Sequence, residues 1–334
     1  MKKHSNIPIF IPELACPHQC VFCDQQKISG THSIPGPDDV KDIVERHLKT
    51  IPENRIISIA FFGGSFTGLP VDLMEQYLKE AFMYVKSGRV SGIRLSTRPD
   101  YINKSVLELL KKYRVTTIEL GIQSTNREVL QRSGRGHTVD HIKDASYLIS
   151  KYGFELGLQM MIGLPGDNYE RSIQTASDIV SLGAVNTRIY PAIVIKGTTL
   201  EKFYHEGEYT PLTLKQAVEW TKDIVQIFET GNIAIIRMGL HPSEELITGK
   251  SLIAGPFHAS FKEMVMTQIW KEILDTELNK FNTRKVKITV SNKQIHYAIG
   301  YRQANRELLN SRGYNVRFVS NPGFSKYQIN VCNN

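Results

Sequence analysis

The chain of 334 residues has few cysteines, no long apolar run and, toward its end, almost no acidic side chains. Four cysteines in a chain of this length do not form a disulfide framework. No apolar run reaches the roughly 18 residues that a membrane-spanning helix needs. The polar start and the short apolar run Ile7–Ile11 do not match a signal peptide. We therefore expect a cytoplasmic protein with reduced thiols and no membrane partner.

Acidic residues are scarce in residues 281–334, here called the basic tail. The tail holds nine of the 41 basic residues but only one of the 33 acidic ones, Glu307. Residues 1–280 therefore hold 32 of each, so the net charge of +8 resides entirely in the tail. Such a concentration is typical of a polyanion-binding surface. A merely solvated basic surface would explain the charge equally well.

Short β-branched runs alternate with longer amphipathic stretches, which predicts parallel βα units. The predicted strands are Ile7–Ile11, Ile56–Phe62, Gly92–Ser96, Thr116–Leu120, Glu155–Met161 and Asn186–Tyr190. The predicted helices are Asp38–Lys49, Val71–Lys86, Lys104–Tyr113, Thr138–Lys151, Tyr169–Leu182 and Leu214–Thr230. We predict an α/β fold, an open (β/α)6 barrel resembling part of a TIM barrel. The expected domains are a core (1–205), a helical extension or substrate cap (206–280) and a small α+β domain (281–334).

Three of the four cysteines lie together in the pattern C-x3-C-x2-C, at Cys16, Cys20 and Cys23. Three such thiolates can hold three irons of a [4Fe–4S] cluster and leave one iron open. The alternatives are a structural zinc site, with His4 or His18 as a fourth ligand, or ordinary buried thiols. No second cysteine cluster is visible, which disfavours an auxiliary cluster and a thiolation reaction.

The other unusual loops each follow a predicted strand. Ligand sites in parallel α/β sheets gather where strands end, so these loops are expected to share one rim with the cysteine loop. They are residues 61–66, 96–100, 120–124, 159–167 and 190–191.

The cysteine spacing, with the aromatic Phe22 before the third cysteine, resembles the radical SAM superfamily. The resemblance implies an enzyme in which S-adenosylmethionine (SAM) occupies the open iron. Its reductive cleavage then gives a 5′-deoxyadenosyl radical that takes hydrogen from the substrate. A low-potential electron donor such as ferredoxin or flavodoxin is implied as a partner. Phe22 would pack near the adenine.

A closer resemblance extends over about residues 7–205, to the coproporphyrinogen-oxidase-like branch and to the catalytic subunit of Elongator, a tRNA-modifying enzyme. It rests on residues 119–137, 157–167 and 188–198 and on Ser-Thr-Arg-Pro-Asp-Tyr-Ile102. The SAM contacts that it implies are Gly63 and Gly64 at the amino group, Arg135 at the carboxylate, and Ser96, Gln123 and Gln159 at the carboxylate, ribose or neighbouring groups. The Elongator subunit has a longer cysteine loop and an acetyltransferase domain without a counterpart here. Carboxymethyl-type products are therefore not expected.

The basic tail has the predicted order strand, helix, loop, helix, strand, strand. These are Lys285–Val290, Lys293–Ile299, Gly300–Gln303, Ala304–Ser311, Asn315–Val319 and Tyr327–Val331. The order resembles a minimal KH domain, whose Gly-x-x-Gly loop clamps a nucleic-acid backbone. The second glycine is replaced by Gln303. The expected RNA contacts are Lys285, Lys287, Gly300, Tyr301, Arg302 and Arg306.

Three hypotheses follow. The first is a radical SAM enzyme that modifies RNA, either tRNA or rRNA, which the tail holds in place. The second is a radical SAM enzyme acting on a small metabolite, and the third is a non-catalytic RNA-binding iron–sulfur protein. His241 and His258 could serve acid–base roles or be surface or structural residues.

Overall fold

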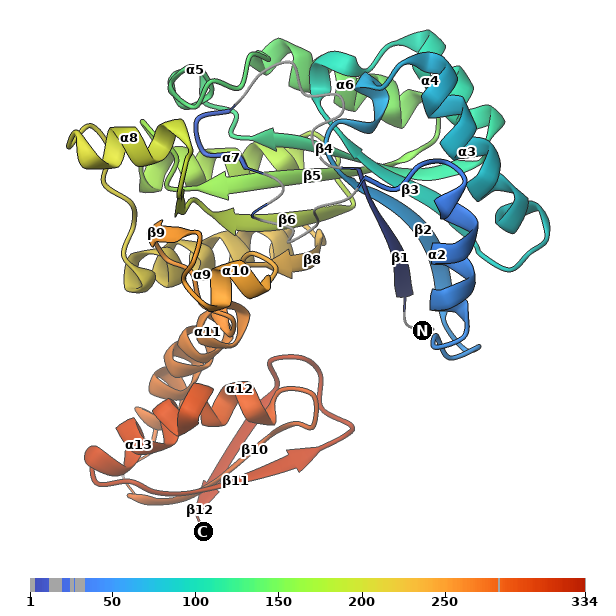
Figure 1. Ribbon diagram of the computed structural model, residues 1–334. Coiled ribbons are helices and arrows are strands. Elements are labelled where there is room, and N and C mark those ends of the chain that lie inside the picture. The colour runs from blue at the N-terminus through green and yellow to red at the C-terminus, as the bar shows by residue number, and fades with distance from the viewer. Residues whose placement is uncertain (1–3, 12–19, 25–26, 28–33, 282, 334) are drawn as a thin grey trace.

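The structure is a computed structural model that describes residues 4–11, 20–24, 27, 34–281 and 283–333. Its main body is a curved sheet of seven strands in the order β1-β2-β3-β4-β5-β6-β8, and all neighbours pair in parallel. Figure 1 shows the sheet curling into a half-barrel with helices along its outer face. The strands are β1 (His4–Ile11), β2 (Ile56–Gly63), β3 (Gly92–Thr97), β4 (Val115–Gln123), β5 (Glu155–Ile162), β6 (Asn186–Pro191) and β8 (Ala234–Met238).

The connections between these strands are helical, which the parallel order requires. The outer helices are α2 (Asp39–Leu48), α3 (Val71–Lys86), α4 (Lys104–Lys112), α6 (Val139–Lys151), α7 (Tyr169–Ser181) and α9 (Leu214–Thr230). Shorter elements at the strand ends are η1 (Phe66–Gly68), η2 (Pro99–Tyr101), α5 (Arg127–Arg132) and α8 (Thr199–His205). The side chains of Asn103, Asn126, Thr138, Asn168, Thr198 and Thr213 cap the helices that follow them by accepting backbone N–H groups.

The two faces of the sheet differ in polarity. Along β3 the buried Ile93, Leu95 and Thr97 alternate with Arg94 and Ser96, which are half-buried. The apolar set packs against the outer helices in the main core, so the alternate residues face the hollow of the half-barrel. The concave face along β3 is therefore polar.

The predicted α/β half-barrel is confirmed, and it has one strand more than the predicted six. β8 is an edge strand of five residues with an exposed Ile236. Such a short run with mixed burial gives only a weak strand signal. A small antiparallel pair, β7 (Val194–Ile195) with β9 (Leu252–Ala254), and the one-turn α10 (Glu244–Ile247) were also not predicted.

The basic tail forms a separate three-stranded sheet in the order β11-β10-β12, with helices on one face. Its elements are β10 (Lys285–Ser291), α12 (Ile295–Ile299), η3 (Tyr301–Gln303), α13 (Ala304–Ser311), β11 (Asn315–Asn321) and β12 (Ile329–Asn333). The observed order matches the predicted one, and β10 pairs in parallel with β11 and antiparallel with β12.

The long helix α11 (Phe261–Leu278) joins the two bodies, as Figure 1 shows. Its first half, including Val265 and Ile269, packs in the core of the half-barrel, and its second half, including Trp270 and Leu274, packs in the core of the tail. Because one rigid helix contributes to both cores, the position of the tail relative to the barrel is defined. No helix in the described residues is long and apolar enough to cross a membrane.

We predict that Trp270→Ala destabilises the tail by about 3–5 kcal/mol, the range for truncating a buried tryptophan. Trp270 is fully buried, and its Nε1 donates to Gln294 Oε1 at 3.0 Å. Amide hydrogen exchange along β10 should accelerate. The half-buried Trp220 of α9 is the control, and Trp220→Ala should leave β10 unchanged. Equal acceleration in both variants would contradict an autonomous tail core.

Candidate active site

The described part of the cysteine loop is a tight turn beside the carboxyl ends of the strands. Cys23 N donates to Cys20 O at 3.0 Å, so both thiols come from one turn. Cys20 is buried and Cys23 is half-buried. Phe22 is buried in a small apolar cluster that includes Met161 and Leu164. Cys16, the first predicted ligand, lies outside the described residues.

The Arg135 guanidinium joins this turn to the sheet. Its Nη1 donates to Cys20 Sγ at 3.1 Å, and its Nη2 donates to the carbonyl of Gly121 near the end of β4 at 2.5 Å. The backbone adds two more links, from Val21 N to Ser133 O at 3.2 Å and from Leu200 N to Val21 O at 2.7 Å. The hydrogen bond from Arg135 to Cys20 Sγ is consistent with Cys20 as a cluster ligand, because hydrogen bonds to the ligand sulfurs help to set the reduction potential of an iron–sulfur cluster.

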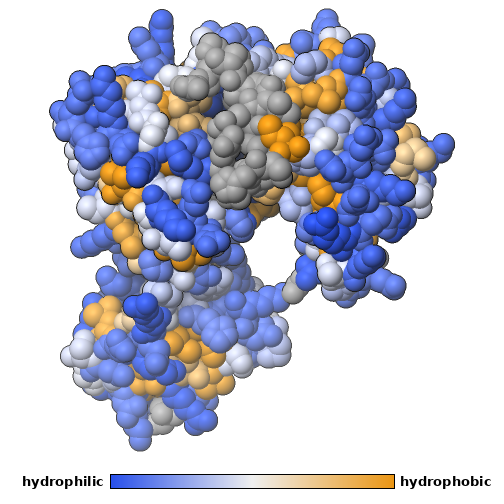
Figure 2. Space-filling model, viewed as in Figure 1, coloured by the Kyte–Doolittle hydropathy of each residue, from blue (hydrophilic) through white to orange (hydrophobic). Residues whose placement is uncertain are grey.

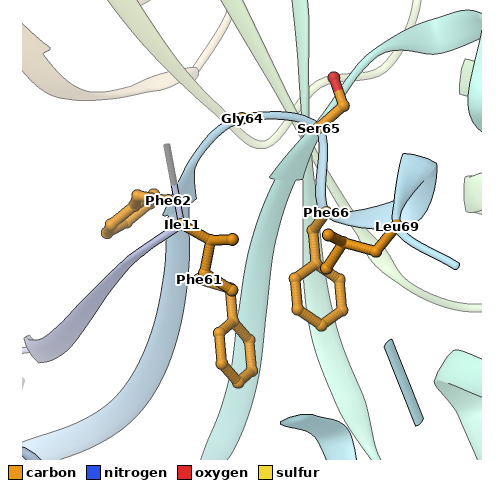
Figure 3. Close-up of a pocket in the computed structure, with 7 residues that line it drawn as sticks. All are labelled: Ile11, Phe61, Phe62, Gly64, Ser65, Phe66 and Leu69. Atoms are coloured by element: carbon orange, nitrogen blue, oxygen red, sulfur yellow. The ribbon is translucent and has the colours of Figure 1, made fainter. Parts of the chain in front are cut away.

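Glycine is required where β2 ends against β1. Gly63 has φ +111°, and a Cβ there would lie 2.9 Å from the carbonyl oxygen of Ile11. Gly64 N donates to this same oxygen at 2.8 Å, which fixes the loop. Figure 3 shows Phe61, Phe66 and Leu69 below this loop and Phe62 on the other side. The cavity among them measures about 10 Å³, so it cannot hold a ligand.

Two of the predicted SAM contacts meet directly. Gln159 Nε2 donates to Gln123 Oε1 at 2.8 Å, and Gln123 adopts φ +64°, an unusual conformation for a residue with a side chain. Ser96 instead donates to Glu119 Oε1 at 3.3 Å. Ser96, Gln123 and Gln159 therefore lie on the neighbouring strands β3, β4 and β5, and the Gln123–Gln159 and Arg135–Cys20 pairs are in direct contact.

Sequence reasoning missed an ion network on the concave face. Glu119 lies 2.8 Å from Arg188 Nε and 3.5 Å from Arg94 Nη2, and all three side chains are at most 14% exposed. Burial opposes the charge of Arg188, but the close carboxylate of Glu119 outweighs it and raises the Arg188 pKa. Burial lowers the pKa of Arg94, and the positive charge of Arg188 lowers it further, while the Glu119 carboxylate opposes both. The Arg188 guanidinium also lies 4.9 Å from the Phe62 ring centre.

His137 is another buried group of the rim that was not predicted. Its Nε2 lies 3.2 Å from the carbonyl of Ile122. Burial, reinforced by the positive charges of Arg135 and Arg98, lowers the His137 pKa to about 3. The ring is therefore neutral near pH 7 and adds no positive charge beside the cysteine loop.

The tail residues predicted to bind RNA occupy two different faces. Gly300, Tyr301 and Arg302 form the loop on the helical side, together with Arg306 of α13. Lys285 and Lys287 alternate along β10 with the buried Val286, Ile288 and Val290, so they lie on the open face of the sheet. A ligand on the loop would not touch both sets.

His241 and His258, whose roles the sequence leaves open, lie in different parts of the structure. His258 Nδ1 accepts from Ser260 N at 2.9 Å, and its ring meets the edge of Tyr301 with the ring centres 5.4 Å apart. His241 lies beside Arg237, with its Nδ1 3.5 Å from Nη1, and burial lowers its pKa. Neither lies among the rim residues described above.

Sequence comparison defines the class of protein. Residues 11–179 match the Radical SAM superfamily, and residues 186–271 match the Radical SAM C-terminal domain. The chain therefore belongs to the radical SAM superfamily. This superfamily uses a [4Fe–4S] cluster and SAM, so the predicted cofactors are confirmed and the zinc alternative is set aside.

Individual relatives agree with the predicted branch. An uncharacterized protein of Methanocaldococcus jannaschii is 30% identical over 238 residues, which cover 67% of this chain and 72% of the relative. The tRNA uridine(34) acetyltransferase of the same organism is 26% identical over 61% of this chain and 45% of its own length. Human Elongator complex protein 3 is 27% identical over 51% of this chain and 35% of its own length. The chain thus corresponds to less than half of these two named relatives.

Solved structures share the fold. The archaeal Methanocaldococcus infernus Elp3 with an N-terminal deletion aligns with a TM-score of 0.64 at 19% identity, over 81% of this chain and 64% of that chain. Streptococcus suis SuiB aligns with a TM-score of 0.52 at 16% identity, over 79% of this chain and 55% of its own. At these identities the likeness concerns the fold alone.

We predict that stability falls as the pH drops below 6.5 and that His137 causes part of the fall. The folded pKa near 3 lies below the ordinary 6.5, so between these values only the unfolded chain binds the proton. His137 thus contributes at most about 1.4 kcal/mol per pH unit to the slope of the free energy of unfolding against pH. The free energy of unfolding of the cofactor-free chain can be measured by urea titration at several values from pH 4.5 to 7. It should depend less steeply on pH in His137→Gln than in wild type. His205→Gln, at an exposed site, should match wild type, and an unchanged His137→Gln slope would contradict the assignment.

Proposed function

We propose that this chain is a radical SAM enzyme that modifies RNA. The observation that carries the catalytic part is the buried Arg135, which joins Cys20 to the end of β4. It ties the cysteine loop to the rim where the Gly63-Gly64 backbone and the Gln123–Gln159 pair are also found. The names of the tRNA-modifying relatives support the choice of RNA as substrate.

Cys16, Cys20 and Cys23 would hold the cluster. The Gly63-Gly64 backbone, Ser96, Gln123, Arg135 and Gln159 would bind SAM, with Phe22 near its adenine. When bound, these cofactors supply a 5′-deoxyadenosyl radical that abstracts hydrogen from the substrate. The protein's own part is to position both partners and to keep the rim dry. Phe22, Met161 and Leu164 supply apolar packing for this purpose.

The tail would hold the RNA. It carries the whole net charge of the chain, and its Gly300–Gln303 loop lies between helices α12 and α13, where a KH domain would have its clamping loop. The helical face, with Arg302 and Arg306, is the proposed contact, and Lys285 and Lys287 form a second cationic face. A cytoplasmic setting and a low-potential donor such as ferredoxin or flavodoxin complete the proposal.

We predict that Cys20→Ala abolishes both the iron–sulfur absorbance and SAM cleavage after anaerobic reconstitution with iron, sulfide and reductant. Loss of one thiolate leaves too few ligands for a three-cysteine site. Cys332→Ala is the matched control, because Cys332 lies on β12 in the tail. A Cys20→Ala variant with wild-type cluster content and turnover would contradict the ligand assignment.

We predict that total cellular RNA stimulates 5′-deoxyadenosine formation by the reconstituted wild-type enzyme. The substrate supplies the hydrogen that makes cleavage productive. Deoxyadenosine formation indifferent to RNA would favour a metabolite substrate. No deoxyadenosine from a fully loaded cluster would favour a non-catalytic protein.

We predict that Arg302→Ala lowers the salt dependence of RNA binding. Each phosphate contact to single-stranded RNA contributes about 0.7 to the slope of log K against log salt. Lys287→Ala, on the opposite face of the tail, should change the slope less. The reverse ranking would place the RNA on the sheet face.

A further inference from the structure

A pocket of about 320 Å³ opens between helix α11 and the Gly300–Gln303 loop of the tail. This volume is near the lower end for small-molecule sites and suits one nucleoside. The proposed SAM site on the rim contains none of its residues. It is lined by Glu263, His296, Tyr297, Ile299, Gly300, Tyr301, Arg302 and Gln303.

The loop that forms one wall is held in a fixed shape. Gly300 has φ +91°, and a Cβ there would lie 2.7 Å from Asn305 N. Tyr301 N donates to Thr267 Oγ1 at 2.8 Å, and Asn305 Nδ2 donates to Thr267 O at 3.0 Å. The pocket is therefore built before any ligand arrives, which lowers the ordering cost of binding.

The pocket also has a fixed position relative to the barrel. Tyr301 contacts His258, whose loop follows β9, and β9 pairs with β7 just after β6. On the far side of the tail, Lys326 and Tyr327 both bind Glu229 of α9. Figure 2 shows an open notch between the tail and the lobe that carries β1 and α2. The pocket is therefore held at a defined place beside the half-barrel.

Glu263 indicates which part of a nucleotide the pocket accepts. Among the described residues, its half-buried carboxylate has no hydrogen bond or ion pair, and it is the one acidic side chain of the lining. A carboxylate repels phosphate, so phosphate belongs near Arg302 and Arg306. The carboxylate instead needs N–H donors from the base, while Tyr297 and Tyr301 offer aromatic surface for stacking.

Guanine suits this arrangement better than the other bases. Its N1–H and N2–H groups are adjacent donors that match the two oxygens of one carboxylate, whereas adenine and cytosine each offer one exocyclic amine on that edge and uracil offers only N3–H. We propose that this pocket binds an unpaired guanosine of the RNA substrate, with Glu263 as the residue that selects it. The proposal rests on the proposed RNA-modifying function and adds the identity of one recognised nucleotide.

The test measures binding of the full-length chain to fluorescent oligouridylates that contain one guanosine, inosine or adenosine. Inosine keeps N1–H but lacks the N2 amine. Wild type should bind the guanosine oligonucleotide about tenfold more tightly than the other two. Glu263→Gln should reduce this preference to less than twofold. Glu307→Gln, which removes the same charge at an exposed site on α13, should keep the preference.

Equal binding of all three oligonucleotides by wild type would overturn the guanosine pocket, and so would a preference that survives in Glu263→Gln. Either result leaves the proposed function intact if RNA still stimulates 5′-deoxyadenosine formation. If the chain bound no RNA and RNA did not change 5′-deoxyadenosine formation, the guanosine pocket and the proposed RNA-modifying function would both be overturned.

Discussion

The Arg135 guanidinium is the interaction on which the rest of the rim depends. It is buried, and its two terminal nitrogens serve two elements far apart in the sequence, the cysteine loop and strand β4. Gly121 leaves room for the neighbouring amide, because a Cβ there would lie 3.0 Å from Gln123 Nε2, whereas its 3.7 Å distance to Arg135 Nη2 would be an ordinary contact. Gln123 adopts a positive φ, and its side chain accepts a hydrogen bond from Gln159.

Much of this arrangement could be predicted from the sequence because local patterns encode it. The alternation of β-branched runs and amphipathic stretches places six strands, and parallel pairing then brings their carboxyl ends to one rim. β8 was missed because Ala234–Met238 is a short edge strand with mixed burial. Cys16 could be proposed from spacing alone and lies outside the described residues.

The ion network shows what spacing cannot reveal. Arg94, Glu119 and Arg188 each interrupt an apolar strand with a charge, which is a signal that the concave face is polar. Their mutual contact depends on the register of β3, β4, β5 and β6, including the shift between Ile93 and Arg94. The sequence pattern within a single strand does not reveal how its residues pair with those of the neighbouring strands. A charged residue in a buried strand therefore predicts a partner but does not identify it.

The Gly300–Gln303 loop of the tail places residues with side chains at two positions of positive φ. Gln303 has φ +62° and Arg302 has φ +51°, so the chain keeps the left-handed turn at a cost of about 1–2 kcal/mol per residue. Thr267 accepts a hydrogen bond from Tyr301 N in this turn, and Asn305 in turn donates to Thr267 O. The helix α11 that carries Thr267 also carries Glu263 and enters the core of the barrel. The strained loop, the carboxylate of Glu263 and the placement of the tail thus all depend on one rigid helix, which fixes the loop relative to the half-barrel.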